Sequence, residues 1–269
     1  MKLTVDGTDL HFEIHGDARD GARPWVVLSH SLACAWQMWA PQIPALTARY
    51  RVLALDTRGH GQSAASPAPY TFDQLADDIA AIGQALRIER PHFVGLSMGG
   101  MIGQTYALRF PGALASLTLA DTASRWPATA HATFVQRAQT ALTEGMEPLV
   151  EPTLARWFTP AFHHSHPDQV ERVGAMIRAT PPMGFAGCAA AVPTINTTDR
   201  LSEIACPMLI IVGKDDGGTP PAMAREIHDH APGSQLVILE NASHLSNIEQ
   251  AAAFNAVLLP FLAAASAAG

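Results

Sequence analysis

The chain has 269 residues, which fits one large α/β domain with room for a small inserted subdomain. Hydrophobic residues make up 48% of it, which excludes a globally disordered protein. The 17 basic and 24 acidic residues give a net charge of −7, and no run of Lys or Arg stands out. A nucleic-acid partner is therefore not expected.

Cysteine usage and the chain ends favour a cytoplasmic protein without membrane contact. Cys34, Cys188 and Cys206 are odd in number and far apart, so no disulfide framework is expected and a reducing compartment suits them. The N-terminus has no apolar signal core. The Ala-rich stretch 251–268 is interrupted by Asn and Pro, so it predicts a helix ending near Leu262 rather than a membrane span.

The first elements expected in the chain are the two strands of a hairpin. Residues 2–5 and 10–14 have strand character, and an Asp-Gly pair lies where the turn would be. His11 and His15 alternate with apolar residues in the second strand, so we expect both to face solvent.

From residue 25 on, short apolar runs alternate with helical patterns. Continuous apolar runs suit strands buried on both faces, and the alternation predicts a mostly parallel sheet wrapped by helices. The fold class expected is α/β, with eight strands when the hairpin is counted. The later strands are expected at 25–29, 50–56, 92–96, 117–120, 208–212 and 236–239, and the helices at 72–87, 98–110, 221–231 and 247–262.

Residues 122–200 break this rhythm, because they contain helical spacing and several prolines but no good strand. Such a length is too great for a loop in a compact domain. We therefore predict a helical cap over 122–200, inserted in a core made of 1–121 and 201–269. Its helices are expected at 131–144, 146–157, 167–179 and 183–191.

The motif Gly95-Leu96-Ser97-Met98-Gly99 follows an expected strand and opens an expected helix. A G-x-S-x-G nucleophile elbow requires this context, because small residues let the strand and the helix approach around a strained turn. Ser97 is therefore the candidate nucleophile. A glycine-rich turn without chemistry is the alternative.

A serine nucleophile needs a base that is held by a third group. The chain order for this kind of site is Ser, acid, His, and His244 follows the last expected strand. Asp215 and Asp216 end the preceding strand, and both positions lie where open α/β sheets place their sites. Asp121, at the end of an earlier strand, is a further candidate acid.

An acyl-transfer site also needs two donors for the developing oxyanion. We expect one from the backbone N–H of Met98 and the other from Leu32, in the loop after the strand at 25–29. Ser31 of the same loop is expected to contact the substrate. His30 is expected to buttress the loop rather than to act as a base.

Two other polar stretches are interpreted as structural. The loop 56–63 is expected to be a turn held by glycines and by an internal pair of Asp56 with Arg58. The histidine cluster at 163–166 has no carboxylate or cysteine at a useful spacing, so it predicts a cap loop and not a metal site. Neither a metal nor a cofactor is expected.

With these motifs in place, the sequence resembles the α/β-hydrolase family over nearly its whole length, and within it the 3-oxoadipate enol-lactonases of aromatic catabolism. The resemblance implies a triad of Ser97, Asp216 and His244, with oxyanion donors Leu32 and Met98. The stretches that carry it are 95–104, 156–162, 184–190, 216–221 and 244–249.

Three positions depart from those lactonases. His30 stands where they tend to have Asn, Ala33 where they have Gly, and Asp121 where they often have Asn. These residues surround the expected scissile carbonyl. The departures leave the prediction of a hydrolase intact and bear on the substrate.

Substrate contacts are expected from the cap. Trp126 and Trp157 offer apolar walls, although they and the aromatic residues Phe158 and Phe162 would equally serve to hold the cap together. An enol-lactone carries a carboxylate, and Arg125 is the candidate anchor through charge-assisted hydrogen bonds; the alternative is a solvated surface arginine.

The function predicted is hydrolysis of a carboxylic ester or lactone through an acyl-enzyme, with 3-oxoadipate enol-lactone as the substrate that the resemblance implies. A broad carboxylesterase and a carbon–carbon bond hydrolase of the same fold remain alternatives. A signalling receptor on this fold is the alternative of another class, and the complete triad argues against it. The partner expected is a small molecule, and the sequence leaves open whether the chain forms a homo-oligomer.

Overall fold

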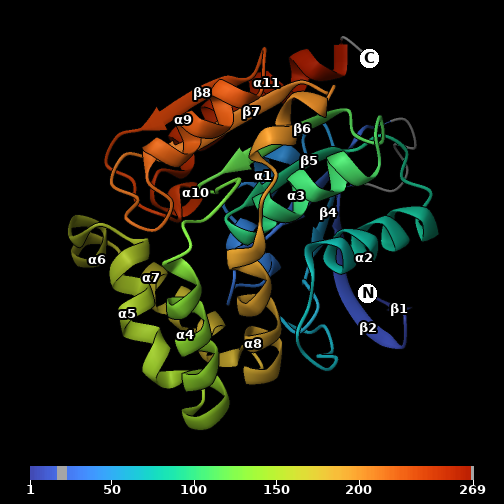
Figure 1. Ribbon diagram of the computed structural model, residues 1–269. Helices are drawn as coiled ribbons and strands as arrows, with labels where there is room; N and C mark the ends of the chain where they lie inside the picture. The colour runs from blue at the N-terminus through green and yellow to red at the C-terminus, as the bar shows by residue number, and fades with distance from the viewer. Residues whose placement is uncertain (17–22, 268–269) are drawn as a thin grey trace.

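The computed structural model describes residues 1–16 and 23–267 (Figure 1). Eight strands form one sheet in the order β1-β2-β4-β3-β5-β6-β7-β8. β1 pairs antiparallel with β2 and β2 with β4, whereas all later pairs are parallel. The predicted α/β class with a mostly parallel sheet is confirmed. The strands are β1 (Lys2–Val5), β2 (Thr8–His15), β3 (Trp25–Ser29), β4 (Arg51–Leu55), β5 (His92–Leu96), β6 (Ser116–Ala120), β7 (Met208–Gly213) and β8 (Gln235–Leu239).

Helices cover both faces of the sheet. In Figure 1, α2, α3 and α9 lie in front of it, and α1 and α11 lie behind. Every residue of β5 and β6 is buried, as the continuous apolar runs predicted. These helices and the short 3₁₀ turns are α1 (Ile43–Leu46), α2 (Phe72–Ala85), α3 (Met98–Arg109), α9 (Pro221–His230), α10 (Ser246–Glu249), α11 (Ala251–Ala267), η1 (Trp36–Trp39), η2 (Val192–Thr194) and η3 (Thr198–Glu203).

The N-terminal hairpin forms as predicted, with positive φ at both Asp6 (46°) and Gly7 (73°) in its turn. The prediction that its histidines face solvent was wrong for His11, which is 3% exposed. Its Nδ1 lies 2.8 Å from Asp56 Oδ2. The loop that begins at Asp56 covers this face of β2, so the polar alternation does not mark a solvated face. His15 is half-buried.

Five helices lie between β6 and β7 in the chain and gather at one end of the sheet, below it in Figure 1. Four occupy the predicted positions. The fifth, α6, contains His163 and His164, which were expected in a loop. Pro160 at its start and the Thr159 hydroxyl, which accepts from Phe162 N–H, explain why a helix forms there. They are α4 (Ala130–Glu144), α5 (Glu147–Trp157), α6 (Pro160–Ser165), α7 (Pro167–Ala179) and α8 (Pro182–Ala191).

The C-terminal helix α11 continues five residues beyond the predicted end at Leu262, to Ala267. Ala265 is buried, and Ser266 Oγ lies 2.8 Å from His92 Nε2 at the start of β5. Contact with the sheet therefore holds a turn that the Ala-rich sequence was expected to leave frayed. Within the described residues, α11 included, no helix is long and apolar enough to cross a membrane.

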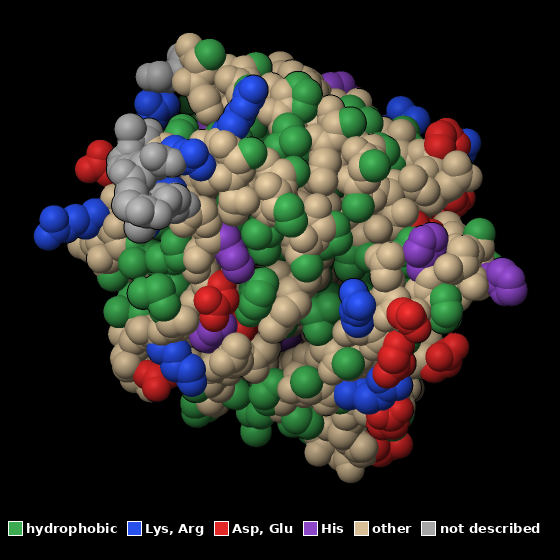
Figure 2. Space-filling model, turned by 180° about the vertical axis from the view of Figure 1, so that it is seen from behind, with side chains coloured by type: hydrophobic (Ala, Val, Ile, Leu, Met, Phe, Trp, Pro, Cys, Tyr) green, Lys and Arg blue, Asp and Glu red, His purple; other side chains and the backbone are tan. Residues whose placement is uncertain are grey.

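The reverse face of the molecule carries charge of both signs. In Figure 2 acidic and basic side chains adjoin at the lower right, and hydrophobic side chains are interspersed with polar ones. The net charge of −7 is thus not gathered into one acidic surface on this face.

Candidate active site

Ser97 forms the turn between β5 and α3, with φ 55° and ψ −117°. Left-handed backbone of this kind is strained for a residue with a side chain, by roughly 1–3 kcal/mol, and persists only where its surroundings hold it. Ser97 N–H donates to Ala120 O (2.8 Å), and the Thr122 hydroxyl donates to Ser97 O (2.7 Å). The neighbouring strand therefore fixes the turn that the G-x-S-x-G motif predicted.

The glycines of this motif are required by contact with backbone atoms. A Cβ on Gly95 would lie 2.2 Å from Gly99 O, and one on Gly99 would lie 2.1 Å from Ser29 O. The carbonyl groups of a packed helix and a packed strand cannot move aside as a flexible side chain can. A larger residue at either position would therefore force backbone atoms of the turn to shift.

We expect Gly99→Ala to lower the free energy of unfolding by about 1–3 kcal/mol, because the new methyl group overlaps the β3 backbone. Gly83→Ala is the matched control. Gly83 lies in α2, and a methyl group added there would meet no atom within 4 Å, so this variant should gain about 0.5–1 kcal/mol from the loss of glycine's freedom in the unfolded chain. Urea unfolding of both variants gives the comparison, and equal effects would contradict the packing argument.

His244 and Asp216 form a buried hydrogen-bonded pair after β8 and β7. Asp216 Oδ2 lies 2.8 Å from His244 Nδ1, and its Oδ1 accepts from the N–H groups of Gly218 (2.7 Å) and Thr219 (3.0 Å). Burial alone would raise the pKa of Asp216, but the charge on His244 and the hydrogen bonds from His244 and Thr219 bring it below its ordinary value. An ionised Asp216 accepts the Nδ1 proton, which leaves Nε2 of the ring as an acceptor.

The other two candidate acids lie elsewhere. Asp121 Oδ1 accepts from Gly213 N–H (2.8 Å), and its Oδ2 lies 2.5 Å from the Ser246 hydroxyl. Asp215 is exposed. Of the three aspartates considered, Asp216 is the one that the structure places against His244.

Burial, and then the nearby charge of Asp216, raise the pKa of Asp121 well above its ordinary value. The folded protein therefore keeps the Asp121 proton to a higher pH than the unfolded chain, and this costs stability as pH rises from about 4. Asn at 121 has no proton to lose and can accept from Gly213 and donate to Ser246.

We therefore expect the stability difference between Asp121→Asn and wild type to shift in favour of the variant as pH rises. Melting temperatures of both proteins, measured from about pH 4 to about pH 8, test this. A difference that stays constant or moves in favour of wild type would show that Asp121 is ionised in the fold.

The loop after β3, where the second oxyanion donor is expected, lies beside Ser97. Ser31 and Leu32 line the same cavity as Ser97, and Met98 opens α3 directly after it. Among the described residues, neither Leu32 N–H nor Met98 N–H donates to a backbone carbonyl. Both groups are thus available to a ligand atom.

His30 buttresses this loop, as predicted. Thr57 N–H donates to its Nε2 (2.8 Å), so the proton lies on Nδ1, which donates to Ser31 O (2.8 Å). Burial lowers the pKa of His30, although the charge of Asp56 opposes this, and the ring is neutral. Ala33 has φ 62°, in the left-handed region that favours glycine.

The prediction that Asp56 and Arg58 pair within the loop 56–63 was wrong. Arg58 forms two hydrogen bonds to Asp78 of α2, at 2.9 and 2.6 Å, rather than to Asp56. Asp56 instead accepts from Trp36 N–H (2.9 Å) and pairs with His11. The loop thus directs the side chains of Asp56 and Arg58 to different elements, which their residue types alone do not indicate.

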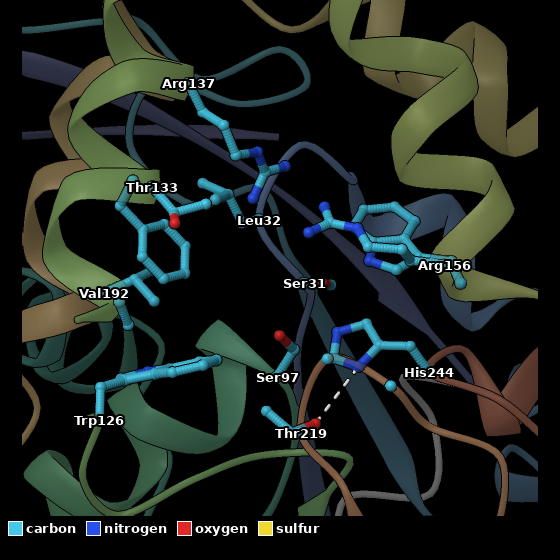
Figure 3. Close-up of a pocket in the computed structure, with 15 residues that line it drawn as sticks. Ser31, Leu32, Ser97, Trp126, Thr133, Arg137, Arg156, Val192, Thr219 and His244 are labelled. Atoms are coloured by element: carbon cyan, nitrogen blue, oxygen red, sulfur yellow. Dashed lines mark hydrogen bonds between the residues drawn. The ribbon is translucent and has the colours of Figure 1, made fainter.

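A cavity of about 240 Å³ lies between the sheet edge and the helices α4 and α5 (Figure 3). Ser97 and His244 both line it, although among the described residues no hydrogen bond joins their side chains, as is common in unliganded enzymes. We call it the Ser97 cavity. Its lining is Ser31, Leu32, Ser97, Trp126, Ala130, Thr133, Phe134, Arg137, Arg156, Trp157, Val192, Gly217, Gly218, Thr219 and His244.

The aromatic residues divide between the two roles considered. Trp126 and Trp157 line the Ser97 cavity, and Trp157 also stacks on the His244 ring with centroids 5.8 Å apart. Phe158 and Phe162 stack on each other at 5.1 Å and do not line it. They therefore belong to the packing of the inserted helices.

The location of Arg125 does not fit the anchor predicted for it. Its side chain is 49% exposed and pairs with Glu226 of α9, and it is absent from the cavity lining. Arg137 and Arg156 line the cavity instead. Arg137 occupies an ordinary helical position in the sequence, so nothing there distinguishes it from a surface arginine. In the described part of the chain, no group of three or more His, Cys, Asp or Glu could hold a metal ion.

The elbow, the buried acid–base pair and the sheet order together match one known family. Residues 24–251 fit the family described as the alpha/beta hydrolase fold. The chain belongs to the α/β-hydrolase family. The family resemblance that the sequence motifs indicated is confirmed.

Relatives within this α/β-hydrolase family include lactonases. The chain is 35% identical to 3-oxoadipate enol-lactonase 2 of Acinetobacter baylyi over 94% of this chain and 92% of that one. It is 34% identical to the putative carbamate hydrolase RutD of Variovorax paradoxus, over 97% of this chain and 98% of that one. The crystal structure of the enol-lactonase from Burkholderia xenovorans matches with a TM-score of 0.94 at 38% identity, covering 98% and 100%.

Proposed function

We propose that this α/β hydrolase cleaves a small carboxylic ester or lactone through an acyl-enzyme. In the proposal Ser97 is the nucleophile, His244 the general base, and Asp216 the acid that orients His244. The observation that carries it is the 2.8 Å contact of His244 with Asp216 at the wall of the cavity that also contains Ser97.

The geometry suits each step of acyl transfer. With its Nδ1 proton bound to Asp216, His244 takes the hydroxyl proton at Nε2 as Ser97 Oγ attacks the carbonyl carbon. The N–H groups of Leu32 and Met98 stabilise the oxyanion, and one such donor is worth about 10²–10³ in kcat. His244 then protonates the leaving oxygen and activates the water that releases the acyl group.

The relatives favour a lactone as the substrate. Two enol-lactonases, at 35% and 38% identity, match this chain over nearly its whole length. An enol is a good leaving group, and a cavity of about 240 Å³ suits a small molecule. Hydrolysis of 3-oxoadipate enol-lactone would place the enzyme in the breakdown of aromatic compounds.

The test compares kcat/KM for 3-oxoadipate enol-lactone and p-nitrophenyl butyrate, with Ser97→Ala as the blank. We expect the wild type to hydrolyse both substrates and Ser97→Ala to hydrolyse neither. The kcat/KM of the wild type should be at least about tenfold higher for the lactone than for the ester, equivalent to about 1.4 kcal/mol. A preference for the neutral ester would make the enzyme a carboxylesterase. Failure to hydrolyse either substrate would overturn the proposal.

A further inference from the structure

Two arginines converge on the Ser97 cavity from different helices. Arg137 comes from α4 and Arg156 from the last turn of α5. In Figure 3 both guanidinium groups point toward the centre of the cavity, on the side opposite Trp126, with Ser97 and His244 beneath them. Neither residue belongs to the proposed triad or oxyanion donors.

Several arginines of this protein form an ion pair with a carboxylate, and Arg137 and Arg156 differ from them. Within the described chain, no ion pair joins an acidic residue to Arg137 or Arg156. Arg137 contacts Thr153 Oγ1 only at 3.4 Å and lies near the rings of Phe134 (5.8 Å) and Phe185 (5.5 Å). The arginines with a carboxylate partner include Arg58, Arg109, Arg125, Arg178 and Arg200.

Both groups carry their charge at a cost. Burial, and then the charge of Arg156, lower the pKa of Arg137 to about 10, so it remains protonated at neutral pH. Arg156 is an exposed residue, yet partial burial lowers its pKa, against the charge of Asp216. No carboxylate of the described chain forms an ion pair with either arginine, so their two like charges repel each other at the cavity wall.

Two buried acids near the cavity, Asp216 and Asp121, do not neutralise these arginines. Asp216 is ionised but is bound by His244, Gly218 and Thr219. A raised pKa favours the neutral form of Asp121. The cavity of an otherwise acidic protein is therefore positive, and an anionic ligand would relieve the repulsion between its arginines.

We propose that Arg137 and Arg156 form a subsite for a carboxylate on the leaving portion of the substrate. Arg156 precedes Trp157, which stacks on His244, so the subsite adjoins the ring that protonates the leaving oxygen. The inference rests on the proposed esterase or lactonase function and deepens it: the enzyme selects anionic over neutral esters. Guanidinium groups bind carboxylates through two parallel hydrogen bonds, which gives direction as well as charge.

The experiment uses two esters of the same shape, 4-acetoxybenzoate and its neutral amide, 4-acetoxybenzamide. Wild type should prefer the anion by about 10- to 100-fold in kcat/KM, the range of one or two charge-assisted hydrogen bonds. Arg137→Gln and Arg156→Gln should each lose about tenfold or more on the anion, mainly through KM, and less than about threefold on the amide. Arg178→Gln is the control, because Arg178 pairs with Glu147 and Glu171 away from the cavity.

Melting temperatures show whether Arg137 binds the substrate carboxylate or only stabilises the fold. Removing an unpaired charge should leave the melting temperature of Arg137→Gln equal to or above that of wild type. A lower melting temperature with equal losses on both esters would overturn the subsite, as would equal use of the two esters by wild type. Absence of turnover of either ester by wild type would instead overturn the proposed hydrolase function.

Discussion

Replacing Ser97 by alanine is expected to lower kcat by about 10⁴–10⁶-fold. The hydroxyl is the group that the proposed mechanism acylates, and no other side chain of the elbow can replace it. The residual rate would come from the oxyanion donors and the binding of substrate, which the substitution leaves in place.

The fold should survive this change. The contacts that hold the turn are made by Ser97 backbone atoms with Ala120 and Thr122, and alanine preserves them. The test measures the melting temperature and the steady-state rate on p-nitrophenyl butyrate for variant and wild type. We expect the melting temperatures to be equal. Activity above a few per cent of wild type would contradict an acyl-enzyme at Ser97.

Asp216→Asn is expected to lower kcat by about 10⁴-fold. The amide has almost the shape of the carboxylate, but it no longer carries the charge that stabilises a protonated His244. Its NH₂ group also favours the tautomer of His244 with the proton on Nε2, which cannot accept a proton from Ser97.

Two matched variants isolate this effect. Asp215→Asn changes an exposed neighbour, and Asp121→Asn changes a buried carboxyl bound to Gly213 and Ser246. Both should keep kcat within about threefold of wild type, since neither contacts His244. A loss in Asp121→Asn as large as that in Asp216→Asn would move the role of the acid to Asp121.

The elements that form by local rules could be predicted from the sequence. The buried strands showed as apolar runs, the hairpin turn as Asp6-Gly7, and the elbow as glycines around Ser97. The order of Ser97, Asp216 and His244 along the chain also indicated these three residues as a group. In the structure Ser97 and His244 line one cavity, and Asp216 contacts His244. Each of these signals depends on backbone geometry or on position relative to a strand end, which a sequence displays directly.

Two of the errors, at His11 and Arg58, share a cause, which is that the partner of a polar side chain is distant in the chain. His11 was expected in solvent because its alternation is that of an exposed strand, but a loop 45 residues on places Asp56 against it. Arg58 was expected to pair with Asp56 in the same loop, whereas its partner Asp78 is 20 residues away. Charge and residue type do not indicate which distant group a long side chain will meet.

The sequence by itself determined the α/β class, the strained turn at Ser97 and the choice of candidate triad residues, because strand periodicity and turn chemistry are local. Only the tertiary structure decided which arginines face the Ser97 cavity. Arg125, Arg137 and Arg156 all lie in or near the inserted helices, but Arg125 meets Glu226 and the other two meet no carboxylate in the described structure. The packing of α4 and α5 over the sheet edge leaves those two charges unpaired, and such packing is a property of the assembled fold.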